Sequence, residues 1–371
     1  ITGANPITSD NPTQKKFNAD GTSLTISNSA TLSLNAQQTV HINAKDNGTV
    51  TIESGSSITS TNSNTIQGKD QSGLTVTNSG TISAAGSKAI NLLNAESSTV
   101  TNNSGGVIKS NTNTITVTEN SGTANNVTIN NSGQISAGAS SSGATSNNAI
   151  RSEDDTDNVT VVNNIGGHIH NNNTSSTALN SSTVFIAANS SATLTNSGTI
   201  ENKGGVENYA IGLAGDGVTL TLKDDGKVIG KISVAGGSTT AHTIKLQHGV
   251  GQAYFYDIDG SGDYTLQDLD GNPVVKGSAG SIGQGGNELV DEELGYKSIA
   301  LRNSLMRFKK SDEYNERDKG WGEITTSFLK RDGGSQSLCK SGPNRDMGSV
   351  WVPPAIMNGK KQQALEEEVT Y

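Results

Sequence analysis

The sequence is poor in the residues that fill an ordinary globular core. Hydrophobic residues make up 31% of its 371 positions and aromatic residues 4%, and Phe17, Phe185 and Tyr209 are the only aromatics among the first 250 residues. Disordered chains are typically rich in charge and proline, whereas this chain has 16% charged residues and 6 prolines. We therefore expect short apolar runs that stack on similar neighbours, as in a solenoid.

Further absences exclude several classes of protein. The single cysteine, Cys339, excludes a disulfide framework and suits a protein exported through an oxidising compartment. The formal net charge of −9 disfavours nucleic-acid binding, which needs clustered lysine and arginine. No apolar run reaches the roughly 18 residues that a membrane-spanning helix requires.

A short motif recurs along the chain and consists of an asparagine-rich pair, a glycine, a spacer and an isoleucine or valine. Copies lie at 28–32, 53–58, 78–82, 103–107, 131–135, 164–169, 196–200 and 224–228. With the third residue of each copy aligned, the motif falls at positions 30, 55, 80, 105, 133, 166, 198 and 226. Three equal steps of 25 residues followed by longer ones predict one repeating coil with later insertions.

Three apolar runs accompany each copy of the motif. In one repeat these are Leu74–Val76 before the glycine, Ile82–Ala84 after it and Ala89–Leu92 later in the coil. Alternation with period 2 is typical of strands with one inward and one outward face. Three strands in about 25 residues predict an all-β parallel β-helix, and seven steps of about 4.8 Å give a rod about 34 Å long.

We interpret the motif as the corner between two strands. Glycine adopts the positive φ that such corners need, and asparagine tolerates it. Asparagines at equivalent corners of stacked coils could also form amide ladders. Ligand contact is the alternative reading, but the turn chemistry favours a structural role.

The segments Val76–Ile82 and Leu194–Ile200 resemble the repeats of bacterial autotransporter passengers, and the resemblance extends over about residues 20–310. It implies a right-handed β-helix that a Gram-negative bacterium exports by type V secretion through its periplasm and outer membrane. It also implies display at the cell surface or secretion, as an adhesin or a self-association module. Expected partners are a host-cell surface, a matrix glycan or protein, the chain itself and its own C-terminal β-barrel during export.

The same resemblance suggests a division of the chain. We expect the β-helix at 1–240, an autochaperone-like cap with a hairpin at 241–286 and a short linker helix at 287–320. Trp321–Ile324 resembles the first strand of a barrel, but about 50 residues are too few for a whole barrel. The remainder, 321–371, is left unassigned.

One segment matches the spacing of a calcium-binding loop. Oxygen-bearing side chains occupy its positions 1, 3, 5, 7 and 12, with glycine at position 6, through Asp257, Asp259, Ser261, Asp263 and Asp268. Position 12 is aspartate where glutamate is usual, and the flanks resemble strands. The sequence therefore favours a β-hairpin that turns at 259–262, with calcium as the weaker alternative.

Enzyme chemistry is disfavoured, and no cofactor is expected. Glu153, Asp154, Asp155 and Asp157 are assigned to the insertion that lengthens the step from 133 to 166. They could act as acid–base carboxylates in a polysaccharide lyase or hydrolase, which is the alternative function. The nearby sequence supplies no activating cation beyond Arg151, and aromatic faces for sugar stacking are lacking.

One pair of histidines stands out as a weak metal candidate. His168 and His170 should share a strand face because they are two residues apart. No further metal ligand lies near them in sequence, and a metal site needs three or four ligands. The sequence therefore assigns no metal or catalytic residue, and it leaves the binding residues unknown.

Overall fold

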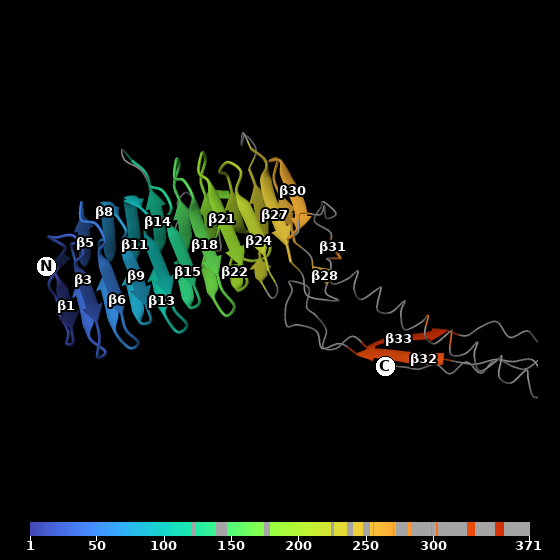
Figure 1. Cartoon of the computed structure of the whole chain (residues 1–371), viewed down its shortest axis with the longest axis horizontal. Helices are drawn as coiled ribbons and strands as arrows, with labels where there is room; N and C mark the ends of the chain where they lie inside the picture. The colour runs from blue at the N-terminus through green and yellow to red at the C-terminus, as the bar shows by residue number, and fades with distance from the viewer. Residues whose placement is uncertain are drawn as a thin grey trace, which may run out of the picture.

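The chain forms a long rod of stacked coils that starts at the N-terminus (Figure 1). The computed structural model describes residues 1–120, 124–138, 147–173, 179–223, 226–235, 240–247, 253–254, 256–269, 271, 281–282, 298, 302, 325–330 and 346–351. The rod is a parallel β-helix of about nine turns with about 26 residues per turn. The predicted fold class is confirmed.

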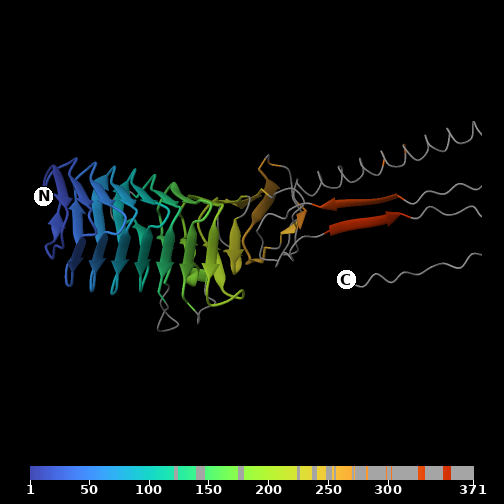
Figure 2. The same cartoon turned by 90° about the horizontal axis from the view of Figure 1, so that it is seen from below.

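Three parallel sheets, named A, B and C here, form the sides of the rod (Figures 1 and 2). Sheet A contains β1 (Ala4–Ile7), β3 (Ser23–Ile26), β6 (Thr49–Ile52), β9 (Thr75–Asn78), β12 (Thr99–Asn102), β15 (Thr128–Asn131), β18 (Val159–Asn163), β21 (Ala192–Asn196), β24 (Thr219–Leu222), β27 (His242–Leu246) and β30 (Tyr264–Asp268). Sheet B contains β4 (Thr31–Leu34), β7 (Ser57–Ser60), β10 (Thr81–Ala84), β13 (Val107–Ser110), β16 (Gln134–Ala137), β19 (His168–Asn171), β22 (Thr199–Asn202) and β25 (Lys227–Ile229). Sheet C contains β2 (Lys15–Lys16), β5 (Val40–Asn43), β8 (Ile66–Ser72), β11 (Ile90–Glu96), β14 (Ile115–Thr118), β17 (Ile150–Ser152), β20 (Val184–Ile186), β23 (Tyr209–Leu213), β26 (Lys231–Val234) and β29 (Ile258–Asp259).

Ladders of aliphatic side chains fill the rod. On sheet B, for example, Ile58, Ile82, Ile108 and Ile135 are paired in register on successive strands, and all four are fully buried. Burial of each such side chain contributes about 1.5–3 kcal/mol. Because every coil stacks on an equivalent one, this core needs few aromatic residues.

The corner between sheets A and B has two forms that alternate along much of the rod. Two residues join the strands after β9, β15 and β21, whereas four residues join them after β6, β12, β18 and β24. The register therefore pairs Ser57 with Thr81 and Thr81 with Val107, which gives steps of 24 and 26 residues instead of two steps of 25. The counterpart of Gly80 is thus Gly106 and not Gly105.

Glycines occupy these corners for two different reasons. Gly55, Gly105 and Gly166 lie in four-residue corners and have φ of 79°, 80° and 81°, as the sequence predicts. Gly80 has a different role, because a Cβ atom on it would lie 2.2 Å from the carbonyl oxygen of Ser56 in the preceding coil. That position requires glycine for close packing of the coils.

The predicted asparagine ladder is present inside the rod. Asn78, Asn102, Asn131, Asn163 and Asn196 end successive strands of sheet A, and all five are fully buried. The Nδ2 atom of each of the first four donates to the Oδ1 atom of the next at 2.8 Å. The asparagines of the motif thus join neighbouring coils.

The parallel coils continue past residue 240. β27 joins sheet A, and β30 pairs with β27 in parallel, with His242 opposite Tyr264. Segment 258–268 therefore adds one strand to sheet C and one to sheet A. The predicted hairpin that turns at 259–262 is wrong, because β29 and β30 pair with the preceding coil and not with each other. Antiparallel pairing in this region joins β28 (Ala253–Tyr254) to β31 (Ser281–Ile282).

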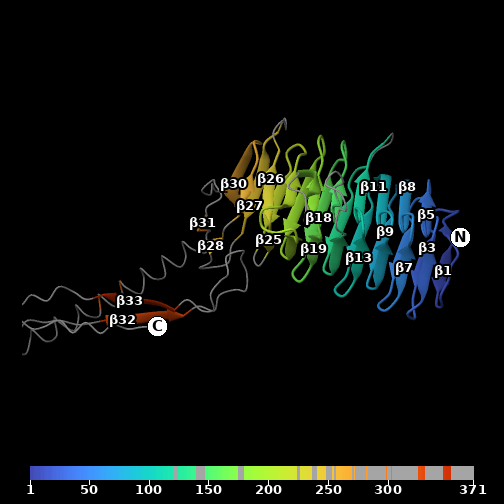
Figure 3. The same ribbon diagram turned by 180° about the vertical axis from the view of Figure 1, so that it is seen from behind.

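The C-terminal predictions lie mostly outside the described residues. Of the expected linker helix at 287–320, only Ser298 and Arg302 are described, and both have helical backbone. The expected barrel strand at 321–324 is not among the described residues. In the region left unassigned, β32 (Thr325–Lys330) pairs antiparallel with β33 (Asp346–Trp351) (Figure 3). Within the described part of the chain, no helix is long and apolar enough to cross a membrane.

Candidate functional site

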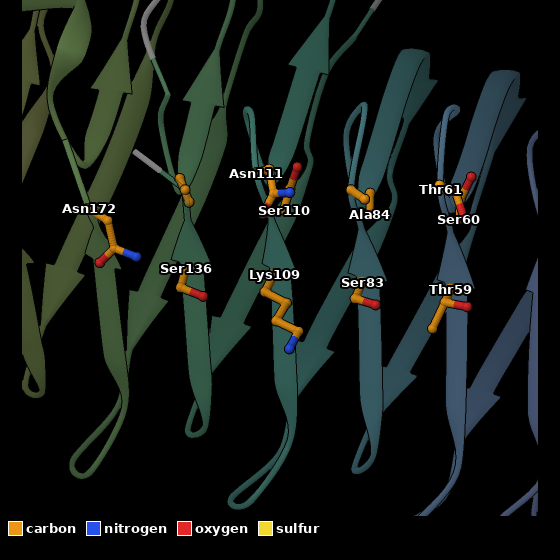
Figure 4. Close-up of a pocket in the computed structure, with 13 residues that line it drawn as sticks. Thr59, Ser60, Thr61, Ser83, Ala84, Lys109, Ser110, Asn111, Ser136 and Asn172 are labelled. Atoms are coloured by element: carbon orange, nitrogen blue, oxygen red, sulfur yellow. The ribbon is translucent and has the colours of Figure 1, made fainter. Parts of the chain in front are cut away.

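A shallow groove crosses the outer face of sheet B and has a cavity volume of about 350 Å³. Thr59, Ser83, Lys109 and Ser136 contribute to it from β7, β10, β13 and β16, where the register pairs each with the next. Figure 4 shows these side chains on four neighbouring strands. The groove therefore runs across the strands, along the axis of the rod.

Small and polar residues complete this groove. Its lining also includes Ser60, Thr61, Ala84, Ala85, Ser110, Asn111, Ala137, Gly138 and Asn172. Hydroxyl and amide groups can both donate and accept hydrogen bonds, and Lys109 is the one charged residue in the lining. The lining contains no carboxylate, histidine or cysteine, and its hydroxyl and amide groups are suited to hydrogen bonding with a polar ligand.

Two histidines lie on the same face, beyond one end of the groove. The ring centroids of His168 and His170 are 4.6 Å apart, so the prediction of a shared face is confirmed. His168 Nε2 is 2.9 Å from Glu201 Oε2, and His170 Nε2 is 2.7 Å from Gln134 Nε2. Glu201 was not among the predicted residues, because β22 is remote in sequence from the two histidines.

The two histidines differ in their environment. His170 is only 3% exposed. Burial is the main cause that lowers its pKa to about 4, and the positive charge of Lys203 and the neighbouring His168 add to the effect. The His170 imidazole is thus neutral at pH 7. Among the residues that the structure describes, no group of three or more histidine, cysteine, aspartate or glutamate side chains could hold a metal ion.

The acidic segment occupies a regular corner between sheets C and A, so its assignment to the insertion was wrong. The extra residues of this coil lie instead between β16 and β17. Arg151 Nε is 2.7 Å from Glu153 Oε1, and the carboxylates of Asp155 and Asp157 accept hydrogen bonds from neighbouring-coil residues. Asp154 is exposed.

The residues of the calcium candidate are spread along one coil. Asp257 and Asp259 lie at β29 of sheet C, whereas Asp263 precedes β30 of sheet A and Asp268 ends it. Ser261 lies in the corner between them and is exposed. Asp259 already accepts hydrogen bonds from the Gly260 N–H at 2.7 Å and from the Tyr209 hydroxyl at 3.2 Å.

The fold defines the chain as a parallel β-solenoid. No model of a known protein family matches it, and neither a curated protein nor a solved structure is similar to it. The groove and the outer faces of the sheets are therefore the features from which a function is argued.

Proposed function

We propose that this chain is an autotransporter passenger that acts outside the cell as an adhesin or a self-association module. The resemblance of its asparagine-glycine corners to passenger repeats, together with the parallel β-helix, supports this proposal. The groove on sheet B is the observation that carries it, because it presents aligned hydroxyls and one lysine across four coils.

The geometry of the groove suits an extended polar chain. Coils repeat every 4.7–4.9 Å or so along a sheet, so a glycan or peptide lying along the rod meets at least one hydroxyl at each step. A single hydrogen bond contributes only about 0.5–1.5 kcal/mol. Binding would therefore arise from many weak contacts and from several rods on one surface acting together.

Lys109 adds a specific preference within that groove. It is exposed, and its neighbours in the lining are uncharged. An ammonium group there favours an acidic group on the ligand, such as the carboxylate of an acidic sugar. The ligand class that fits the groove is therefore an acidic glycan of a host surface or matrix.

The test places the passenger on the surface of a bacterium and measures adhesion to plates coated with acidic or neutral glycans. Lys109→Glu reverses the charge in the groove and should lower adhesion to the acidic glycan about tenfold. The matched control is Lys69→Glu, on β8 of sheet C. Equal adhesion of wild type and Lys109→Glu would remove the groove from the proposal, and no adhesion or clumping by the wild type would refute the function itself.

A further inference from the structure

The outer face of sheet A carries two straight rows of threonines. In register, one row contains Ser23, Thr49, Thr75, Thr99, Thr128, Thr160, Thr193 and Thr219, and the other contains Thr25, Thr51, Thr77, Thr101, Asn130, Val162, Thr195 and Thr221. We call these sixteen residues the threonine face. Thirteen of them are threonine and none is charged.

The preference of strands for threonine does not explain these two rows, because the other two sheets do not carry such rows. The matching outer row of sheet B contains Thr31, Ser57, Thr81, Val107, Gln134, His168, Thr199 and Lys227. The corresponding row of sheet C contains His41, Gln67, Asn91, Thr116, Arg151 and Phe185, but four of these six are buried, so sheet B is the exposed comparison. A preference of exposed strand positions for threonine would act on sheets A and B alike, so it does not account for the rows on sheet A.

The threonine face is open to a partner except at Thr221, which is buried. Within the described part of the chain, no side-chain hydrogen bond involves the threonine hydroxyls of this face. Sheet B differs, since the Ser57 hydroxyl donates to that of Thr31 and the Thr59 hydroxyl donates to that of Ser33. The face thus presents regularly spaced donors and acceptors that the fold itself leaves unused.

We propose that the threonine face binds the threonine face of a second copy of this chain. This inference rests on the proposed function and identifies the partner and surface of its self-association. Each hydroxyl both donates and accepts, so the face is complementary to itself. The second copy has the same strand spacing, so its rows of hydroxyls remain aligned with those of the first copy over many coils.

Charge and area are consistent with a reversible dimer. None of the sixteen residues is charged, although Lys245 follows Thr221 in the second row, so two copies meet over the threonine face itself without like-charge contact. The eight strands of the face, spaced about 4.8 Å apart and with about 13 Å of strand each, present about 500 Å² per copy. The total of about 1,000 Å² is typical of weak, transient complexes, so we expect weak pairing that many copies on facing cells reinforce.

The test is a charge swap on the full chain, measured by sedimentation velocity over a range of concentrations. Thr75→Lys with Thr128→Lys places cations two coils apart on the threonine face, and Thr75→Glu with Thr128→Glu places anions there. Like charges across an interface oppose pairing strongly. Each double variant alone should therefore dimerise at least about tenfold more weakly than wild type, and an equimolar mixture of the two should regain the dimer.

The control places lysines at Thr31 and Thr81, on the outer face of sheet B, and it should dimerise like wild type. Recovery in the mixture also excludes misfolding as the cause of the loss. Unchanged dimerisation of the lysine variant, or a mixture that stays monomeric, would overturn the inference. A wild type that stays monomeric yet adheres through Lys109 would also overturn it and leave the proposed adhesin function intact.

Discussion

Removal of one internal asparagine from the buried ladder should destabilise the rod locally and strongly. Asn131 accepts a hydrogen bond from Asn102 and donates one to Asn163, both at 2.8 Å, and it is fully buried. Asn131→Ala removes these two ladder bonds, worth about 1 kcal/mol each, together with the bonds between its side chain and the backbone of Gly133 at 3.1 and 3.2 Å. It also leaves buried polar partners unpaired, so the total loss is about 3 kcal/mol or more. Such a loss corresponds to about a hundredfold change in the opening equilibrium of these coils.

Native-state hydrogen exchange is the appropriate assay, because a solenoid opens by regions and a single global unfolding energy is poorly defined for it. Peptides that cover β12, β15 and β18 should exchange about a hundredfold faster in Asn131→Ala, while those from β3 should change little. Asn130→Ala, whose side chain lies on the outer face, is the matched control and should stay within about 0.5 kcal/mol of wild type. A change below about 0.5 kcal/mol for Asn131→Ala would refute the role of the ladder.

Two further predictions concern protons and calcium. In the fold the pKa of His170 is about 4, whereas its ordinary value is 6.5, so the unfolded chain binds more protons between those pH values. Stability should therefore fall as the pH drops from about 6.5 to 4, and His170→Gln should flatten the curve of melting temperature against pH; an unchanged curve would contradict this. Because the oxygens of Asp259 already accept hydrogen bonds, millimolar calcium should raise the melting temperature no more than magnesium does. A calcium-specific rise that Asp257→Ala with Asp259→Ala abolishes would restore the site.

The corner motif shows where reading of the sequence succeeds and where it fails. Its period and the apolar runs around it predict the three-stranded coil, because side chains that alternate along a strand must face inward or outward. The sequence does not distinguish the two-residue corner from the four-residue corner, because both contain asparagine and glycine at nearly the same spacing. Only the register shows that Gly106, and not Gly105, stacks below Gly80.

The groove and the threonine face could not be identified from the sequence. Thr59, Ser83, Lys109 and Ser136 lie about a coil apart from one another, and insertions of variable length separate the later coils. The partner of His168 could not be predicted either. Glu201 reaches His168 only because β19 pairs with β22, which is remote in sequence.

By itself, the sequence determined the period of the coils, the inward ladders and the asparagines that join them. Those features follow from local chemistry, namely strand alternation and the conformations that glycine and asparagine allow at corners. The tertiary structure decided which outward side chains become neighbours. Outward residues carry no burial signal, so their alignment depends on how many residues each corner contains, and that number is settled only when the coils stack.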